Sequence, residues 1–151
     1  MSNGVTDIHI HIQPWEMLRE EIRRSWTRSQ KGFETLERYA KDQAAFVAML
    51  DEAGIERAGI INYSSPDIMG FTDGVNDFVA KFTRNHRDRL IPFGSVHPRF
   101  TKNPAAEMDH LAGDLGIRGI KIHPPHQLVT PNAYRTEGLK ELEIIYGKAQ
   151  E

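Results

Sequence analysis

The feature that most constrains the fold is a cycle of one strand followed by helix, which recurs four times along the chain. Short segments rich in β-branched or aliphatic residues predict strands at residues 5–12, 57–63, 90–96 and 117–123. Helical periodicity follows each of them, at about residues 15–30 and 35–53, then at 73–87, 104–115 and 136–149. Strands that alternate with helices form βαβ units, so the sequence predicts a parallel sheet with right-handed crossovers.

Four such cycles make half of an eight-stranded (β/α) barrel, which typically needs about 250 residues, whereas this chain has 151. We therefore expect an α/β fold of the TIM-barrel type with about four of its eight units present, as a half-barrel or incomplete barrel. Residues 1–151 are predicted to form one domain, with residues 14–31 as a helical insertion after the first strand. Its open sheet edges would favour a homo-oligomer or pairing with a missing C-terminal half.

The composition is that of an ordinary globular protein and narrows the range of functions. A net charge of −2 and 26% charged residues argue against a protein that binds nucleic acid or an anionic membrane through bulk charge. No apolar run approaches the roughly 18 residues of a membrane span, and the N-terminus lacks a secretory signal. Cysteine is absent, so we expect a cytoplasmic protein in which any metal is held by histidine and carboxylate.

The first strand carries the clearest chemical pattern, Asp7-Ile8-His9-Ile10-His11. Side chains alternate along a strand, so His9 and His11 share one face with Asp7, about 7 Å apart at their Cα atoms. Two neutral imidazoles on one face are able to bind one divalent ion, and imidazole suits zinc, iron or nickel. The plainer interpretation is a pair of histidines on an exposed strand face, with the isoleucines on the other.

Histidines also end two later strands. In a parallel α/β sheet the functional site lies beyond the carboxyl ends of the strands, where His97 and His123 join His11. Lys121 shares a face with His123 and would need a carboxylate such as Asp7, or an anion, beside it. We therefore predict that His123 and Lys121 are catalytic and that His97 contacts substrate.

Trp15 follows the first strand directly and opens the arginine-rich segment up to about Gln30. One interpretation of this segment is a solvated helix with internal ion pairs. The alternative is an excursion over the mouth of the site, in which Trp15 binds substrate.

These motifs carry a resemblance to a known family. Thr6–His11, the later Gly116–Pro124 and the four βα cycles resemble the amidohydrolase superfamily. The resemblance is strongest to the amidohydrolase-related (amidohydrolase 2 type) hydrolases and decarboxylases, and it covers essentially the whole chain but only the N-terminal half of that family's barrel. It implies that His9 and His11 are metal ligands, for zinc or else manganese or iron. It also places Lys121 where some relatives carry a metal-bridging carbamylated lysine.

The resemblance further implies an enzyme acting on a small molecule: a metal-dependent hydrolase in which metal-activated water attacks an amide, ester or lactone carbonyl. A non-oxidative, metal-dependent decarboxylase (a carboxy-lyase) on the same scaffold is one alternative, and a non-enzymatic α/β binding or assembly domain is another. The family's further ligands, histidines after strands five and six and an aspartate after strand eight, have no counterpart in this sequence. The 151-residue chain is therefore predicted to be weakly active or inactive alone.

Overall fold

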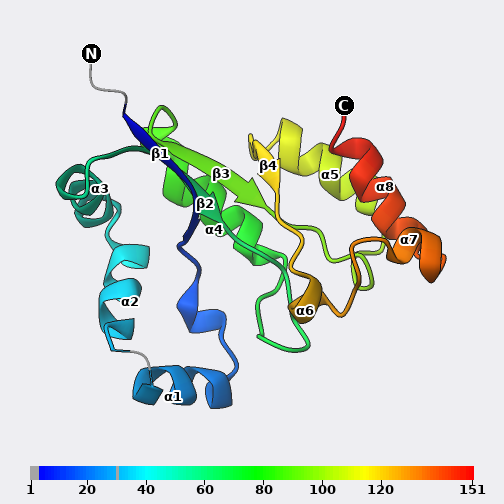
Figure 1. The fold of residues 1–151 in the computed structure, drawn as a ribbon, viewed down its shortest axis with the longest axis horizontal. Coiled ribbons are helices and arrows are strands. Elements are labelled where there is room, and N and C mark those ends of the chain that lie inside the picture. The colour runs from blue at the N-terminus through cyan, green and yellow to red at the C-terminus, as the bar shows by residue number, and fades with distance from the viewer. Residues whose placement is uncertain (1–3, 30) are drawn as a thin grey trace.

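A computed structural model describes residues 4–29 and 31–151 and shows four parallel strands curled into a half-barrel, with helices between them (Figure 1). The strands lie side by side in chain order: β1 (Val5–His11), β2 (Ile55–Ile61), β3 (Leu90–Gly94) and β4 (Gly119–Ile120). Every neighbouring pair is parallel. The predicted α/β fold with a partial TIM-barrel organisation is thus confirmed.

Helices occupy every connection between strands. The link from β1 to β2 holds a 3₁₀ turn, η1 (Trp15–Met17), and the helices α1 (Glu20–Ser29), α2 (Phe33–Lys41) and α3 (Gln43–Glu52). The next links hold α4 (Gly74–Thr83) with the 3₁₀ turn η2 (Arg84–His86), and then α5 (Pro104–Gly113). After β4 come α6 (Pro124–Gln127), α7 (Ala133–Thr136) and α8 (Lys140–Lys148). None of the helices in the described ranges is long and apolar enough to cross a membrane.

Several elements differ from the sequence-based expectation for local reasons. The helix expected at 35–53 is divided at Asp42, whose backbone is extended and whose carboxylate accepts a hydrogen bond from the Ala45 backbone N–H at 3.0 Å as the cap of α3. The last helix is interrupted by Gly138, which has a φ of +67°. The first helix begins at Glu20 instead of Trp15, and its expected end at Gln30 lies outside the described residues.

The strand expected at 117–123 is reduced to Gly119–Ile120. β3, its one neighbour in the sheet, ends at Gly94, and the last ladder contact runs from the Lys121 N–H to the Gly94 carbonyl at 2.8 Å. The chain beyond that point has no strand to pair with and passes through His123 into α6. Lys121 and His123 therefore lie in the segment that leaves the sheet.

The core lies between the sheet and the helices that cover it. Its buried apolar side chains come from the strands, from α3 to α5 and from the first turn after β1; they include Ile12, Trp15, Phe46, Leu50, Ile60, Val75, Val79, Leu90 and Leu111. β1 is less well covered than its alternation suggests, because Ile8 is 68% exposed and Ile10 is only partly buried. Ile12, directly after the strand, is fully buried. The first strand therefore forms an open edge of the sheet with an apolar side chain in solvent.

A buried asparagine fixes the carboxyl end of β3. The Asn76 side chain on α4 accepts a hydrogen bond from the Ser95 N–H at 2.9 Å and donates one to the Ser95 carbonyl at 3.0 Å. Ser95 is the first residue after β3, so Asn76 satisfies the backbone polar groups that the strand ladder leaves unpaired.

We expect the Asn76→Ala substitution to lower the free energy of unfolding by about 2–4 kcal/mol, because it leaves a buried donor and a buried acceptor of Ser95 unsatisfied. Urea-induced unfolding followed by circular dichroism measures this change. The Asp77→Ala variant is a matched control on the exposed side of the same helix, where we expect a loss of no more than about 1 kcal/mol. Equal effects of the two substitutions would contradict this role of Asn76.

Candidate metal centre

The rings of His9 and His11 converge at the carboxyl end of β1. Their Nε2 atoms lie 3.1 Å apart, and their ring centroids are 5.0 Å apart. Two ligands of a tetrahedral zinc ion with bonds of 2.0–2.1 Å would be separated by about 3.3 Å. The two nitrogens are therefore spaced to share one divalent ion.

A local irregularity of β1 accompanies this convergence. The register between β1 and β2 shifts between Asp7 and Ile10, and the Asp7 carboxylate accepts a hydrogen bond from the His9 N–H at 2.9 Å. Gly59 on β2 allows the close approach, because a Cβ atom there would lie 2.7 Å from the Ile8 carbonyl oxygen. Asp7 forms no ion pair with Lys121 among the residues that the structure describes.

Gln13, a fully buried residue, orients the second histidine of the pair. Its side-chain amide lies 3.3 Å from Nδ1 of His11, on the side of the ring opposite Nε2. Burial, followed by the charges of His9, Lys121 and His123, lowers the pKa of His11 to about 4. The His11 ring is therefore neutral near pH 7, which is the form that binds a metal ion.

Metal binding places a specific demand on Gln13. A ligating Nε2 leaves the ring proton on Nδ1, which must then donate to an acceptor. The amide of Gln13 supplies that acceptor when its Oε1 atom faces His11, since the two ends of a side-chain amide exchange by a simple flip. In the orientation that the structure shows, the amide nitrogen faces Nδ1 and its N–H donates to it. His11 then carries its proton on Nε2, the atom that faces His9.

A pocket of about 500 Å³ opens beside the histidine pair. Aromatic and apolar side chains form much of its wall, and Trp15 and Trp26 contact each other with ring centroids 5.9 Å apart. Trp26 comes from α1 and Leu36 from α2. The segment that contains η1, α1 and α2 therefore supplies part of the pocket wall. The complete lining is His9, Ile10, His11, Gln13, Trp15, Trp26, Leu36, Tyr63, His123 and His126.

The rings of Tyr63, His123 and His126 form another part of the pocket wall. His123 and His126 stack with centroids 4.2 Å apart, and Tyr63 lies 4.5 Å from the His123 ring. The Tyr63 hydroxyl is 2.9 Å from Nδ1 of His126. Burial raises the pKa of Tyr63 to about 12, so the hydroxyl keeps its proton near neutral pH. Burial also lowers the pKa of His126. The hydroxyl donates to Nδ1 in the His126 tautomer that carries its proton on Nε2, and it accepts from Nδ1 in the other tautomer.

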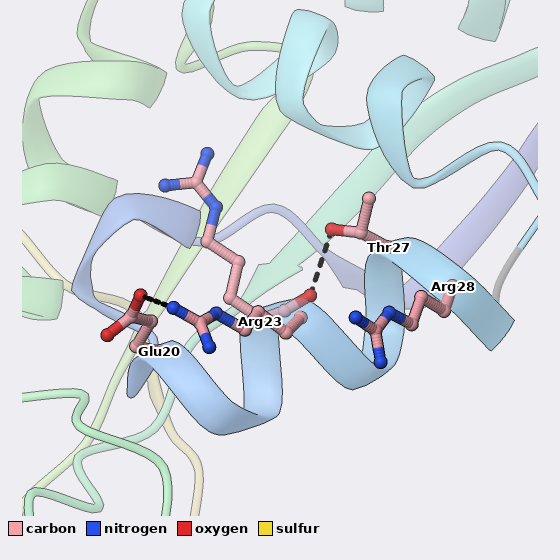
Figure 2. Close-up of a pocket in the computed structure, with 5 residues that line it drawn as sticks. Glu20, Arg23, Thr27 and Arg28 are labelled. Carbon is pink, nitrogen blue, oxygen red and sulfur yellow. Dashed lines mark hydrogen bonds and ion pairs between the residues drawn. The ribbon is translucent and has the colours of Figure 1, made fainter.

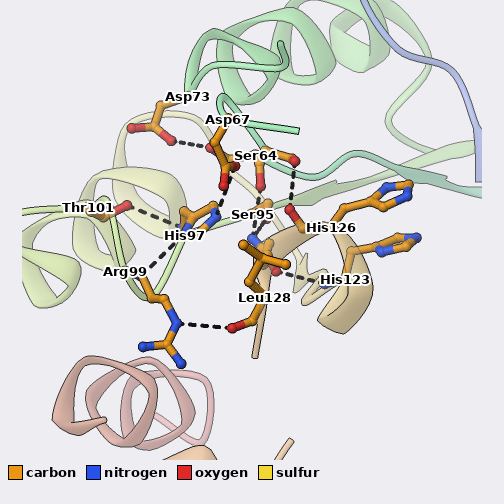
Figure 3. A network of polar contacts seen from close by, with 12 residues as sticks. Ser64, Asp67, Asp73, Ser95, His97, Arg99, Thr101, His123, His126 and Leu128 are labelled. Atoms are coloured by element: carbon orange, nitrogen blue, oxygen red, sulfur yellow. Dashed lines mark hydrogen bonds and ion pairs between the residues drawn. The ribbon is translucent and has the colours of Figure 1, made fainter. Parts of the chain in front are cut away.

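The segments that follow β2, β3 and β4 meet around Ser64, Ser95 and His123 (Figure 3), and a buried glutamine, Gln127, joins them. Gln127 accepts a hydrogen bond from the His123 N–H at 2.7 Å and donates to the Ser64 carbonyl at 3.1 Å. It also lies 3.2 Å from the Ser95 hydroxyl, which in turn donates to the Lys121 carbonyl at 2.8 Å. This network joins the segments that follow β2, β3 and β4.

The predicted site residues are thus only partly brought together. His9, His11, Trp15 and His123 line one pocket, whereas Lys121 is half-buried beside it, close enough to depress the pKa values of His11 and His123. His97 lies outside the lining and is 1% exposed. The functions assigned to all six residues remain predictions.

His97 is enclosed by its own loop and the loop after β2 (Figure 3). Its Nδ1 accepts a hydrogen bond from the Arg99 N–H at 3.2 Å, and its backbone N–H donates to the Thr101 hydroxyl at 3.2 Å. Nε2 is 4.0 Å from an Asp67 carboxylate oxygen. Burial lowers the pKa of His97, an effect that Asp67 opposes.

Sequence reasoning missed Gln13, Tyr63, Trp26 and Gln127 as parts of this site. Gln13 continues the period-two face of His9 and His11, and Tyr63 follows the second strand, so both carried a usable signal. The place of Trp26 depends on how α1 is oriented, which no local pattern specifies. His126 lies beside His123 because one short helical turn follows His123.

Among the residues that the structure describes, no group of three or more histidine, aspartate or glutamate side chains converges to hold a metal ion. The fold and the site define an α/β half-barrel with a histidine pair at the carboxyl end of its first strand.

The chain belongs to the amidohydrolase family: the family model described as Amidohydrolase matches residues 6–150. This membership indicates hydrolase or decarboxylase-type chemistry that generally uses divalent metals. Among curated proteins and among solved structures, nothing matches the chain.

We expect Gln13→Leu, which removes the acceptor for Nδ1 of His11 at similar side-chain volume, to weaken divalent metal binding about 10–100-fold. Competition titration of Zn²⁺ against a chromophoric chelator measures this affinity. Gln13→Glu is the matched control, because it keeps an oxygen acceptor at the same place. Unchanged affinity in Gln13→Leu would contradict a role for Gln13 in orienting His11.

His97 makes folding sensitive to acid. Its pKa is lowered in the folded chain, so below about pH 6.5, the ordinary histidine value, the unfolded chain binds a proton that the folded ring resists. This ring therefore costs no stability above pH 6.5 and reduces stability as the pH falls, by at most about 1.4 kcal/mol per pH unit.

We expect His97→Asn, which keeps an acceptor near the position of Nδ1, to lose less stability between pH 7.5 and pH 5.5 than the unsubstituted chain. Urea unfolding at the two pH values gives both slopes. His86→Asn serves as the control for general loss of a histidine. Identical slopes for the unsubstituted chain and His97→Asn would overturn this assignment.

Proposed function

We propose that the chain acts as a metal-dependent hydrolase on a small-molecule amide, ester or lactone, with His9 and His11 as ligands of one divalent ion. The single observation that carries this proposal is the 3.1 Å separation of the two Nε2 atoms at the mouth of an open pocket. A divalent ion at this position lowers the pKa of water and polarises a carbonyl group. Zinc is the first candidate, with manganese and iron as alternatives.

The remaining side chains of the pocket supply orientation and proton transfer. In the tautomer whose Nδ1 accepts from Tyr63, His126 presents an Nε2 proton able to hydrogen-bond a substrate oxygen. His123, whose ring lies 4.5 Å from that of Tyr63 and 4.2 Å from that of His126, is the candidate proton carrier, and Lys121 beside it supplies a positive charge for an anionic group. Trp15 provides an apolar contact for the non-reacting part of the substrate. The predicted contact of His97 with substrate would require its enclosing loops to open.

A non-oxidative decarboxylase is the second candidate function, and one observation favours it. The pocket is bordered by the rings of Trp15, Trp26 and Tyr63, which suit a flat aromatic acid. In that reaction the histidine pair would hold the ion that anchors the carboxylate, and proton delivery to the ring carbon would fall to His123 or His126.

Metal binding is the first test. We expect the chain to bind about one equivalent of Zn²⁺ or Co²⁺ and the His9→Ala/His11→Ala variant to bind none under the same conditions, as measured by elemental analysis after dialysis and by calorimetry. The His86→Ala/His110→Ala variant loses two histidines away from the pocket and should keep the site. Equal metal content in all three proteins would favour the non-enzymatic interpretation.

Turnover is the second test. Because the described residues supply two ligands and no third, we expect the metal-loaded chain to hydrolyse activated esters and lactones slowly, at a rate above that of the His9→Ala/His11→Ala variant. Release of CO₂ from hydroxybenzoates, without hydrolysis, would assign the decarboxylase instead. Turnover that is identical in the double variant would exclude both assignments.

A further inference from the structure

A second pocket, of about 370 Å³, lies at the other end of the sheet and is lined by three arginines. Arg57 is on β2, Arg87 follows η2, and Arg118 directly precedes β4. Arg57 pairs in register with Thr6, whereas Ile61 pairs with His11. Four residues of strand, roughly 13 Å, therefore separate this pocket from the level of the histidine pair.

No carboxylate compensates these charges. The pocket is lined by Arg57, Arg87, Ile91, Pro92, Gly116 and Arg118, without aspartate or glutamate. Within the described residues, no ion pair and no side-chain hydrogen bond involves Arg57 or Arg118. The ion pairs that lysine and arginine form in the structure involve other residues. The two side chains thus keep all their N–H donors for a ligand.

The arginine-rich helix α1 shows the contrasting arrangement (Figure 2). Its pocket includes Glu20, which pairs with Arg24, and Arg23 pairs with Glu37 on α2. Arg23 and Arg24 on α1 are therefore balanced by acidic neighbours, as in an ordinary solvated helix, whereas Arg28 forms no ion pair among the described residues. The cluster formed by Arg57, Arg87 and Arg118, called the arginine cluster below, lacks such neighbours.

Arg87 is held rigidly within the arginine cluster. Its guanidinium donates to the carbonyls of Gly116 at 2.7 Å, Leu115 at 3.0 Å and Ala80 at 3.3 Å. Burial and then the charge of Arg118 lower the pKa of Arg87, which reports the repulsion between the two cations. The fold therefore fixes the charge of Arg87 in the pocket and places the exposed residues Arg57 and Arg118 in the same lining.

We propose that the arginine cluster binds a multiply charged oxyanion, most simply the phosphoryl group of a small phosphorylated molecule. Arg57 and Arg118 would clamp the oxygens through paired N–H donors, the geometry in which guanidinium binds phosphate. Arg87 contributes fixed charge and its two remaining donors, the Nε–H and one Nη1–H. Such a ligand neutralises the repulsion among the three cations, so binding would also stabilise the fold. This site is independent of the hydrolase proposal.

Thermal unfolding and calorimetry of the 151-residue chain test the proposal, with inorganic phosphate and glycerol phosphate as probes in metal-free buffer. Sodium chloride at matched ionic strength controls for general screening. We expect both probes to raise Tm above the chloride control, and we expect Arg57→Gln or Arg118→Gln to weaken binding at least about tenfold. A response to inorganic phosphate alone would identify the free anion as the ligand, and tighter binding of glycerol phosphate would identify an ester.

Matched variants separate binding from folding. The Arg57→Gln/Arg118→Gln variant should unfold in chloride at a temperature equal to or above that of the unsubstituted chain, because like charges have been removed. Arg24→Gln/Arg28→Gln removes two cations from α1 and should keep the full response to phosphate. The proposal is overturned if phosphate raises Tm no more than chloride does, or if the cluster double variant keeps the response.

Discussion

The structure depends on a buried polar network that ties together the carboxyl ends of three strands. Parallel strands end with backbone groups that the ladder no longer pairs, and here Gln127, Ser95 and Asn76 satisfy them. Gln127 alone connects the segments after β2, β3 and β4, with Ser65 donating to the His126 carbonyl at 2.7 Å alongside it. Since every one of these side chains is fully buried, each hydrogen bond forms at low dielectric and loss of any partner is costly.

This network explains why one half of the pocket is better fixed than the other. Tyr63 and His126 are set by the network and by their own hydrogen bond, whereas the histidine pair, His9 and His11, lies on β1, the edge strand. That strand has a neighbour on one side only, its register to β2 is irregular, and Ile8 is exposed on its open side. Gln13 and Ile12, both fully buried directly after His11, are what anchor the pair to the core.

The hydrophobic periodicity of the sequence, together with the glycine and proline residues that end its elements, was enough to predict the parallel sheet, the order of the elements and the histidine pair. Those features are local or follow from the handedness and connectivity of βαβ units. The division at Asp42 and the short β4 were not predictable in the same way, because an aspartate cap competes with helical periodicity, and a strand's length depends on its neighbour. His97 shows the same limit: its position at a strand end was readable, but the enclosing contacts with Asp67 and Thr101 come from two loops.

The two ends of the sheet solve opposite electrostatic problems. At the carboxyl end, burial and mutual repulsion keep His11 and His123 largely uncharged, so several basic groups share a pocket at little cost, and a metal ion or a substrate can supply the charge. At the amino end, arginine cannot lose its proton near neutral pH, so the arginine cluster keeps three full charges together. Because histidine side chains can lose their proton, several of them lie together without lowering the stability of the fold. Arginine side chains keep their charge, so their mutual repulsion lowers the stability of the fold unless an anion binds. The amino-end pocket is therefore the one whose ligand most directly affects folding.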